Sequence, residues 1–307
     1  MVNNVSFSVT NKCNCQCKIC NIWQTPSFDN ELSVAEIDTL FSNPGFVNVD
    51  TISFTGGEPF LRNDFMDIIR TCKARLPNLN RIFLNTNATC PEKVMDICKE
   101  CATIFNETIL SISLDGRPEI HNLLRGVPVY NRAIQLIQNT KSIPNLKLSL
   151  SMTLSGHNCN IVDLEHVHQI ANTNGCMFSF RFADKSTTYY KNSDVQFGIT
   201  SYAKQQVSRY IQQNCSENSF LLVLKHFIDT GRVPLLQEGD SNKCLAGKHF
   251  VFIHPNGDIA PCLYSTQKIS LEQLNAAQKI QLGKQEPCPC CTDCAIYPIL
   301  EHLQKLK

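Results

Sequence analysis

The sequence has no excess of charge of either sign and no long apolar run. Its 28 lysines and arginines balance 27 aspartates and glutamates, for a formal net charge of +1. That balance gives no electrostatic reason to expect a nucleic acid or a membrane surface as a partner. No apolar stretch approaches the roughly 18 residues of a membrane span. Residues 1–4 show no basic segment leading into an apolar run, as a signal peptide would. We therefore expect a cytoplasmic protein.

Cysteine, by contrast, is abundant, at 17 of 307 residues. The count is odd, and a reducing cytosol argues against a disulfide framework. Metal clusters are the better explanation for the grouped cysteines, while the scattered ones are expected to be small buried hydrophobes.

The first cysteine group is Cys13, Cys17 and Cys20, in the spacing C-x3-C-x2-C. Three thiolates on one short loop can hold three corners of a cubane iron–sulfur cluster, whereas an all-cysteine cubane needs four. One iron would then stay open to an outside molecule. Zinc or scattered buried thiols are the alternatives, but zinc usually recruits a His or a second Cys pair. No His precedes His121, and Cys15 is read as an extra, non-ligating thiol.

From the start of the chain to residue 182, strand and helix patterns alternate, which predicts parallel strands with helical crossovers. The helix after Ser33 has a capping box with Glu36. Six units predict an α/β fold, a partial (β/α)6 TIM-like barrel rather than the full eight. The expected strands after the first are 51–54, 81–84, 108–114, 146–154 and 177–182, and the expected helices are 33–41, 64–76, 91–101, 130–140 and 161–172.

Unusual residues follow the carboxyl ends of these strands, the edge at which parallel α/β folds bind ligands. They are the cysteine loop, Thr55-Gly56-Gly57-Glu58-Pro59, Asn85-Thr86-Asn87, Ser113-Leu114-Asp115-Gly116 and Arg181. We expect them to line one rim.

The character of the sequence changes at Lys243. Two β-rich runs flank Asn256-Gly257, a strong hairpin signal, and this hairpin is expected to bring Cys244 and Cys262 together. A knot of cysteines follows at 288–294. We expect three regions: a barrel at 1–183, a helical linker at 184–242 and a small cysteine-rich extension at 243–307.

Taken together, the cysteine loop, Gly56-Gly57-Glu58-Pro59 and Ser113-Leu114-Asp115-Gly116 resemble the radical S-adenosylmethionine (SAM) enzymes. The resemblance implies a SAM-binding 4Fe–4S cluster on the three cysteines. It also implies a site for the SAM ammonium at Gly56, Gly57, Glu58 and Pro59, and contacts from Asn87, Ser113 and Arg125 to the SAM ribose and carboxylate. Leu154 would pack against adenine, with core packing as the equal alternative, and a solvated side chain is the alternative for Arg125.

The region from 243 resembles the SPASM/twitch extension of that family, through Gly257-Asp258-Ile259-Ala260-Pro261-Cys262. The tail is too short for two auxiliary clusters, so the resemblance implies one auxiliary 4Fe–4S cluster. Its expected ligands are Cys244, Cys262, Cys291 and Cys294, with Cys288 or Cys290 able to replace one of the last two. Structural zinc is the alternative.

The resemblance implies that the reduced cluster splits SAM and that the resulting 5′-deoxyadenosyl radical takes a substrate hydrogen. The leading hypothesis is dehydrogenation of a small sugar-like metabolite, with a flavodoxin or ferredoxin as reductant. The alternatives are a peptide-modifying maturase, an epimerase with Cys15 or Cys176 as hydrogen donor, and a non-catalytic iron–sulfur or zinc module. Both cysteines are expected near the rim, with buried packing as the alternative for Cys176.

Overall fold

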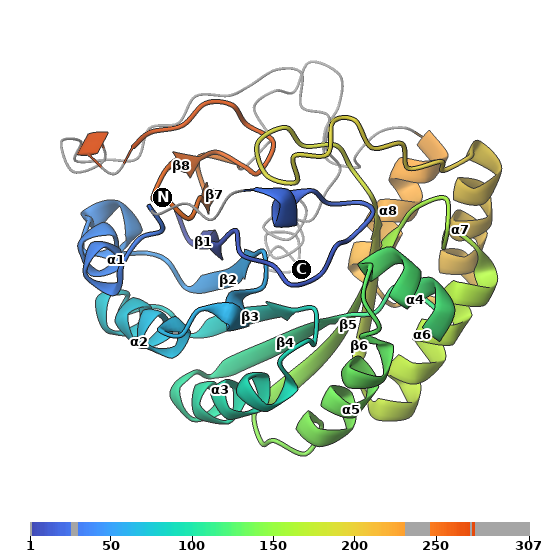
Figure 1. Cartoon of the computed structure of the whole chain (residues 1–307), viewed down its shortest axis with the longest axis horizontal. Helices are drawn as coiled ribbons and strands as arrows, with labels where there is room; N and C mark the ends of the chain where they lie inside the picture. Colours follow the sequence, from blue (N-terminus) through green and yellow to red (C-terminus); the bar gives the residue numbers. More distant parts are fainter. Residues whose placement is uncertain (1, 26–29, 231–245, 271, 274–307) are drawn as a thin grey trace.

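The computed structural model describes residues 2–25, 30–230, 246–270 and 272–273. Its strands form one curved sheet in the order β6-β5-β4-β3-β2-β1-β7-β8 (Figure 1). All neighbours pair in parallel except β7 and β8. The strands are β1 (Asn4–Thr10), β2 (Thr51–Gly56), β3 (Arg81–Thr86), β4 (Glu107–Ser113), β5 (Leu146–Leu154), β6 (Met177–Phe182), β7 (Phe250–Ile253) and β8 (Ile259–Ala260).

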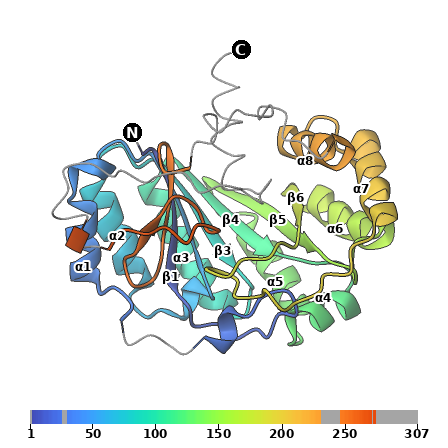
Figure 2. The same cartoon turned by 90° about the horizontal axis from the view of Figure 1, so that it is seen from above.

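Helices cover the outer face of the curved sheet, and two more pack side by side beyond β6 (Figures 1 and 2). Apolar side chains of the strands and helices form the buried core between these layers. The covering helices are α1 (Val34–Phe41), α2 (Phe65–Arg75), α3 (Pro91–Ile104), α5 (Tyr130–Thr140) and α6 (Ile161–Asn174), and the pair beyond β6 is α7 (Ser201–Asn214) and α8 (Ser219–Thr230).

The predicted partial barrel is confirmed, because the α/β units leave the sheet open rather than closed. The capping box is also confirmed: the Ser33 hydroxyl accepts from the Glu36 N–H, and the Glu36 carboxylate accepts from the Ser33 N–H. One helix was missed, α4 (Pro118–Arg125). Proline in its first turn and Gly126 at its end are ordinary boundary signals that mark it.

The predicted hairpin is present, with β7 antiparallel to β8. It does not stand apart from the barrel, however, since β7 pairs in parallel with β1, with Val251 opposite Val5. The side chains of Val251, Ile253 and Ile259 are fully buried in the main core. The described part of the 243–307 region therefore continues the barrel sheet.

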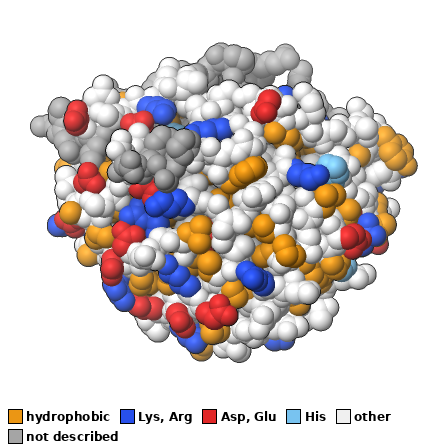
Figure 3. Space-filling model, in the orientation of Figure 1, with side chains coloured by type: hydrophobic (Ala, Val, Ile, Leu, Met, Phe, Trp, Pro, Cys, Tyr) orange, Lys and Arg blue, Asp and Glu red, His pale blue; other side chains and the backbone are white. Residues whose placement is uncertain are grey.

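No described helix has the length and apolar character that a membrane crossing requires. On the face seen in Figure 3, acidic and basic side chains lie interspersed, in keeping with the balanced composition.

Candidate functional site

A cavity of about 360 Å³ opens at the carboxyl ends of the strands and runs down the inner face of the sheet. Cys13, Cys17 and Cys20 all line it, as do Gly56, Gly57, Glu58, Pro59, Asn87, Ser113, Arg125 and Arg181. The strand-end residues that the sequence placed on one rim are thus brought together.

The cysteine loop is fixed on one side by the glycine-rich segment after β2. The Gly57 N–H donates to the Thr10 carbonyl over 2.7 Å, and the Glu58 N–H donates to the Lys12 carbonyl over 2.8 Å. A Cβ on Gly57 would lie 2.1 Å from the Lys12 carbonyl oxygen. Only glycine allows the two backbones to approach so closely.

On its other side the same loop is held by the end of α4. The Gln16 N–H donates to the Arg125 carbonyl and the Lys18 N–H to the Leu124 carbonyl, each over 2.9 Å. Gly126 ends the helix at φ 69°, and a Cβ there would lie 2.5 Å from the Gln16 carbonyl oxygen. The end of α4 therefore holds the cysteine loop in place.

The three thiols of the motif lie in different electrostatic environments. Burial raises the pKa of Cys13 to about 11 and that of Cys20 to about 12. The pKa of Cys17 is lowered to about 7, first by a hydrogen bond from Cys15 and further by the positive charge of Arg125. Cys15 is almost fully buried, and its bond to Cys17 raises its own pKa.

Arg125 is buried rather than solvated, so the solvated alternative is wrong. Its side chain is 13% exposed, and its Nε donates to Asp115 Oδ2 over 2.7 Å. Asp115 Oδ1 in turn accepts from the Thr153 N–H over 3.0 Å. The Arg125 Nη1 lies 3.9 Å from Cys17 Sγ. Asp115 stands in the S-x-D-G motif, but its role of orienting Arg125 was not foreseen.

Glu58 is buried as well, and both of its carboxylate oxygens have partners. Oε1 accepts from the Thr86 hydroxyl over 2.9 Å, and Oε2 accepts from the Asn87 N–H over 2.7 Å. Burial raises the Glu58 pKa to about 7. The Glu58 carboxylate thus fixes the loop after β3. On this loop, Asn87 Nδ2 lies 3.8 Å from Cys13 Sγ.

Leu154 is fully buried in the main core and is absent from the described cavity lining, so the core-packing alternative holds there. Two further cavity residues, Tyr189 and Tyr190, come from the loop after β6, which the sequence leaves as either a cover for the substrate or an ordinary loop. The Tyr189 hydroxyl lies 2.9 Å from Thr55 Oγ1, and the Tyr190 hydroxyl bonds with Arg181.

Cys176 directly precedes β6, so it lies at the amino edge of the sheet, opposite the cysteine loop. Its predicted place near the rim is wrong. Cys262 packs against the same small apolar cluster as Cys20, which includes Ile22 and Tyr189. The other expected auxiliary ligands, Cys244, Cys291 and Cys294 with Cys288 and Cys290 as replacements, lie outside the described residues.

The donor set fits an iron–sulfur cluster, because such clusters are held by cysteine thiolates. The three cysteines of the motif, Cys13, Cys17 and Cys20, all line one cavity. Within the described ranges, no group of three His, Cys, Asp or Glu side chains is arranged to hold a single metal ion.

A family model described as the Radical SAM superfamily matches residues 7–168. The chain is 24% identical over 311 residues to the probable GTP 3′,8-cyclase of Archaeoglobus fulgidus, covering 94% of this chain and 96% of that protein. The GTP 3′,8-cyclase of Limosilactobacillus fermentum is 29% identical over 154 residues, 49% of this chain but only 45% of that protein.

The mycofactocin maturase MftC of Mycobacterium tuberculosis is 24% identical over 268 residues, which are 85% of this chain and 64% of that protein. Among solved structures, SuiB of Streptococcus suis bound to S-adenosylmethionine superimposes with a TM-score of 0.68 at 16% identity. That match covers 90% of this chain and 65% of SuiB, which has also been solved with its precursor peptide SuiA. At such identity the likeness supports the fold alone.

Proposed function

This chain belongs to the radical SAM superfamily, and from that premise we propose that Cys13, Cys17 and Cys20 hold a 4Fe–4S cluster to which SAM binds. When bound, the cluster supplies the electron that cleaves SAM and yields a 5′-deoxyadenosyl radical, which abstracts a substrate hydrogen atom. The observation that carries the proposal is the placement of all three thiols on one cavity with the strand-end residues.

The chain's own residues bind and orient SAM at that cavity. We assign the N–H groups of the SAM amino group to the backbone carbonyls of the Gly56–Pro59 segment, because the Glu58 carboxylate already accepts two hydrogen bonds. Ser113 and Arg125 would hold the SAM carboxylate, as charge-assisted bonds to a buried arginine are strong. Asn87 would reach the ribose from the loop after β3.

The inner face of β4, β5 and β6 offers a surface for the substrate. Small hydroxyl side chains from these strands line the cavity where branched apolar residues usually fill a barrel. The Ser151 hydroxyl lies 2.9 Å from that of Ser111 and 3.3 Å from that of Ser179. This hydroxyl belt comprises Ser111, Ser113, Ser149, Ser151, Thr153 and Ser179.

Among the described lining residues, Arg125 and Arg181 are the cations and Glu58 is the carboxylate. Two arginines are a poor match for a nucleoside triphosphate, which would need more positive charge to be desolvated. Hydroxyls both donate and accept, as peptide groups do. We therefore favour peptide modification over oxidation of a sugar-like alcohol. One relative is named as a maturase, and none of the named relatives supports the oxidation.

We further propose one auxiliary 4Fe–4S cluster held by Cys262 with Cys244, Cys291 and Cys294. The shared packing of Cys262 and Cys20 supports a position for it beside the first cluster. Anaerobic reconstitution is then expected to give roughly eight iron atoms per chain, four per cubane. Cys262→Ala should lower this to about four while some SAM cleavage persists; unchanged iron content would contradict the ligand assignment.

The test of the main proposal is formation of 5′-deoxyadenosine from SAM by the reconstituted chain with dithionite. We expect slow formation of 5′-deoxyadenosine in the absence of substrate. A flavodoxin or ferredoxin, as the natural reductant, should be able to replace dithionite. Cys17→Ala should abolish it. Cys176→Ser removes one thiol at the opposite edge of the sheet and should leave it unchanged. Equal product from Cys17→Ala and the wild type would refute the proposal.

The substrate class is tested by mass spectrometry of candidate substrates after turnover with SAM. Two kinds of probe are used: GTP, and short peptides that are encoded beside the gene. We expect a mass change in a peptide and none in GTP. A product formed from GTP with peptides left intact would overturn the peptide assignment without touching SAM cleavage.

A further inference from the structure

We propose that Arg125 and Asn87 are positioning residues that raise the reduction potential of the cluster, each by directing an N–H group at the sulfur of one cluster ligand. The inference rests on the proposed function, since it requires a cluster on Cys13, Cys17 and Cys20. It assigns to both side chains a role toward the thiolates that is separate from any contact with SAM.

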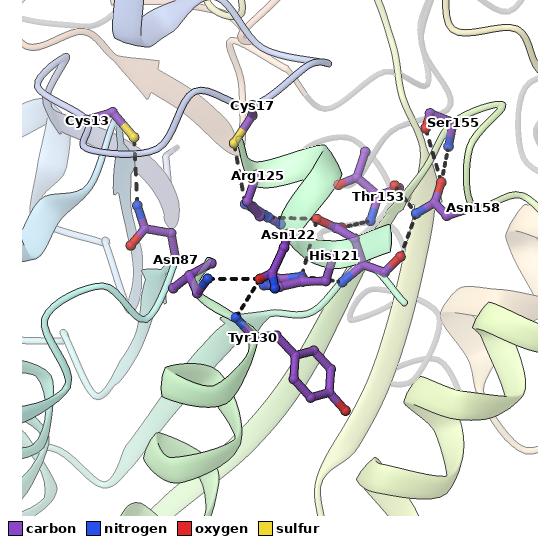
Figure 4. A network of polar contacts seen from close by, with 12 residues as sticks. Cys13, Cys17, Asn87, His121, Asn122, Arg125, Tyr130, Thr153, Ser155 and Asn158 are labelled. Atoms are coloured by element: carbon purple, nitrogen blue, oxygen red, sulfur yellow. Dashed lines mark hydrogen bonds and ion pairs between the residues drawn. The ribbon is translucent and has the colours of Figure 1, made fainter. Parts of the chain in front are cut away.

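The two donors approach two different thiols from two different elements (Figure 4). Arg125 Nη1, at the end of α4, lies 3.9 Å from Cys17 Sγ. Asn87 Nδ2, on the loop after β3, lies 3.8 Å from Cys13 Sγ. Both distances are those of hydrogen bonds to the large sulfur atom.

The orientation of Asn87 is set by the chain. Its Oδ1 accepts from the Thr89 N–H over 3.0 Å and from the Thr89 hydroxyl over 2.6 Å. The amide oxygen is thereby held at Thr89, so the amide nitrogen faces the thiol. Nδ2 also donates to Asn14 Oδ1, and the Asn87 N–H donates to Glu58. The donor is therefore in place before any cluster binds.

Arg125 is fixed in the same manner by a buried carboxylate. Its Nε donates to Asp115 Oδ2, and Asp115, 1% exposed, is held by the N–H of Thr153 and by the ring of His121, which accepts the Asp115 N–H. The guanidinium thus presents its Nη1 end to Cys17 while its Nε end faces Asp115. The positive end of this ion pair points at the cluster ligand.

Reduction adds one electron, from an external donor, to the cluster and its thiolates. Hydrogen bonds and positive charge at the sulfurs favour the more negative, reduced state, so they raise the potential. Water screens this effect weakly at a buried site. Arg125 should have the larger effect because it carries a full charge.

The test is a redox titration of the reconstituted full chain, monitored by EPR. The signal of the SAM-binding cluster is first identified as the one whose line shape SAM alters, and the titration is then run without SAM. Arg125→Met should lower the ratio of reduced to oxidised cluster about tenfold at a fixed potential, a shift of about 59 mV for one electron. Arg125→Lys, which keeps the charge, should restore most of this shift. Asn87→Asp keeps the Oδ1 acceptor but replaces the donor by a carboxylate oxygen, and should also shift the midpoint downward.

Arg70→Met is the matched control, because it removes the same charge from a surface ion pair with Asp67 and Glu100. Its midpoint should equal that of the wild type. Native iron content with an unchanged midpoint in both Arg125→Met and Asn87→Asp would overturn the inference. If Arg125→Met fails to assemble a cluster, an unchanged Asn87→Asp midpoint alone overturns it. A wild type that assembles no SAM-sensitive cluster would instead refute the proposed function.

Discussion

At the scale of single residues, the site depends on side chains whose partners come from the chain itself. Asp115 orients Arg125, and Glu58 fixes the backbone of Asn87. Both carboxylates are 1% exposed, so their hydrogen bonds are poorly replaced by water. The loops that would contact SAM are thus preorganised, which lowers the entropic cost of binding.

His254, in the turn between β7 and β8, makes stability depend on pH. Burial lowers its pKa to about 4, whereas an unfolded histidine titrates near 6.5. Below pH 6.5, His254 binds a proton in the unfolded chain but stays neutral in the folded chain. Stability is therefore present above pH 6.5 and is lost as the pH falls toward 4. This site alone should cost roughly 1.5 kcal/mol between pH 6.5 and 5.

His254→Phe should remove that loss and keep the edge-on ring contact with Phe252, whose centroid is 4.9 Å away. Urea unfolding of the cluster-free chain at pH 6.5 and 5 measures the difference. His226→Gln, at an exposed position on α8, is the control and should match the wild type. An equal acid loss in His254→Phe would show that His254 is not the group responsible.

At the scale of elements, two helix ends offer a matched comparison. Gly126 and Gly175 end α4 and α6 at φ 69° and 65°. Alanine in that region costs roughly 1–2 kcal/mol, so both alanine variants should lose that much stability in denaturant unfolding. Only at Gly126 would the Cβ also meet the cysteine loop, while Gly175 faces open space.

Gly126→Ala should therefore also displace the loop and lower the iron content after reconstitution, whereas Gly175→Ala should take up iron as the wild type does. Iron and sulfide analysis of the folded variants decides this. Full iron uptake by Gly126→Ala would mean that the end of α4 does not hold the loop.

The sequence predicts most elements because their signals are local. Alternation of strands and helices, the capping box at Ser33 and the Asn256-Gly257 turn all lie within a few residues of the structure they specify. The same holds for the rim, because parallel strands bring their carboxyl ends to one edge. The ion pair of Arg125 and Asp115 joins residues ten positions apart across α4, a helix that was missed, so its geometry was out of reach.

At the scale of the whole molecule, the main departure from expectation is the place of β7. Its pairing with β1 joins residues 246 positions apart, such as Val5 and Val251, and no local pattern in either strand specifies that partner. The hydroxyl belt was missed for a similar reason. In the sequence, single serines within strands indicate only the ordinary alternation of polar and apolar residues. The strand register is what places Ser111 beside Ser149 and Ser151 beside Ser179.

The placement of β7 predicts how the chain responds to deletion of residues 243–307. An independent extension could be removed without cost to the barrel. The structure instead buries Val251, Ile253 and Ile259 completely, each worth about 1.5–3 kcal/mol, and deletion would also expose the edge of β1. We expect residues 1–242 to lose several kcal/mol and to aggregate. Thermal unfolding equal to that of the full chain would favour a separate domain.

The most direct measurement is electron–nuclear double resonance on the reduced, reconstituted chain with SAM labelled with ¹⁵N at its amino group. A cluster held by Cys13, Cys17 and Cys20 alone leaves one iron to bind that nitrogen. We predict a hyperfine coupling that changes with the isotope and is lost in Cys17→Ala. A cluster signal that SAM does not perturb, with no coupling to the label, would contradict the account.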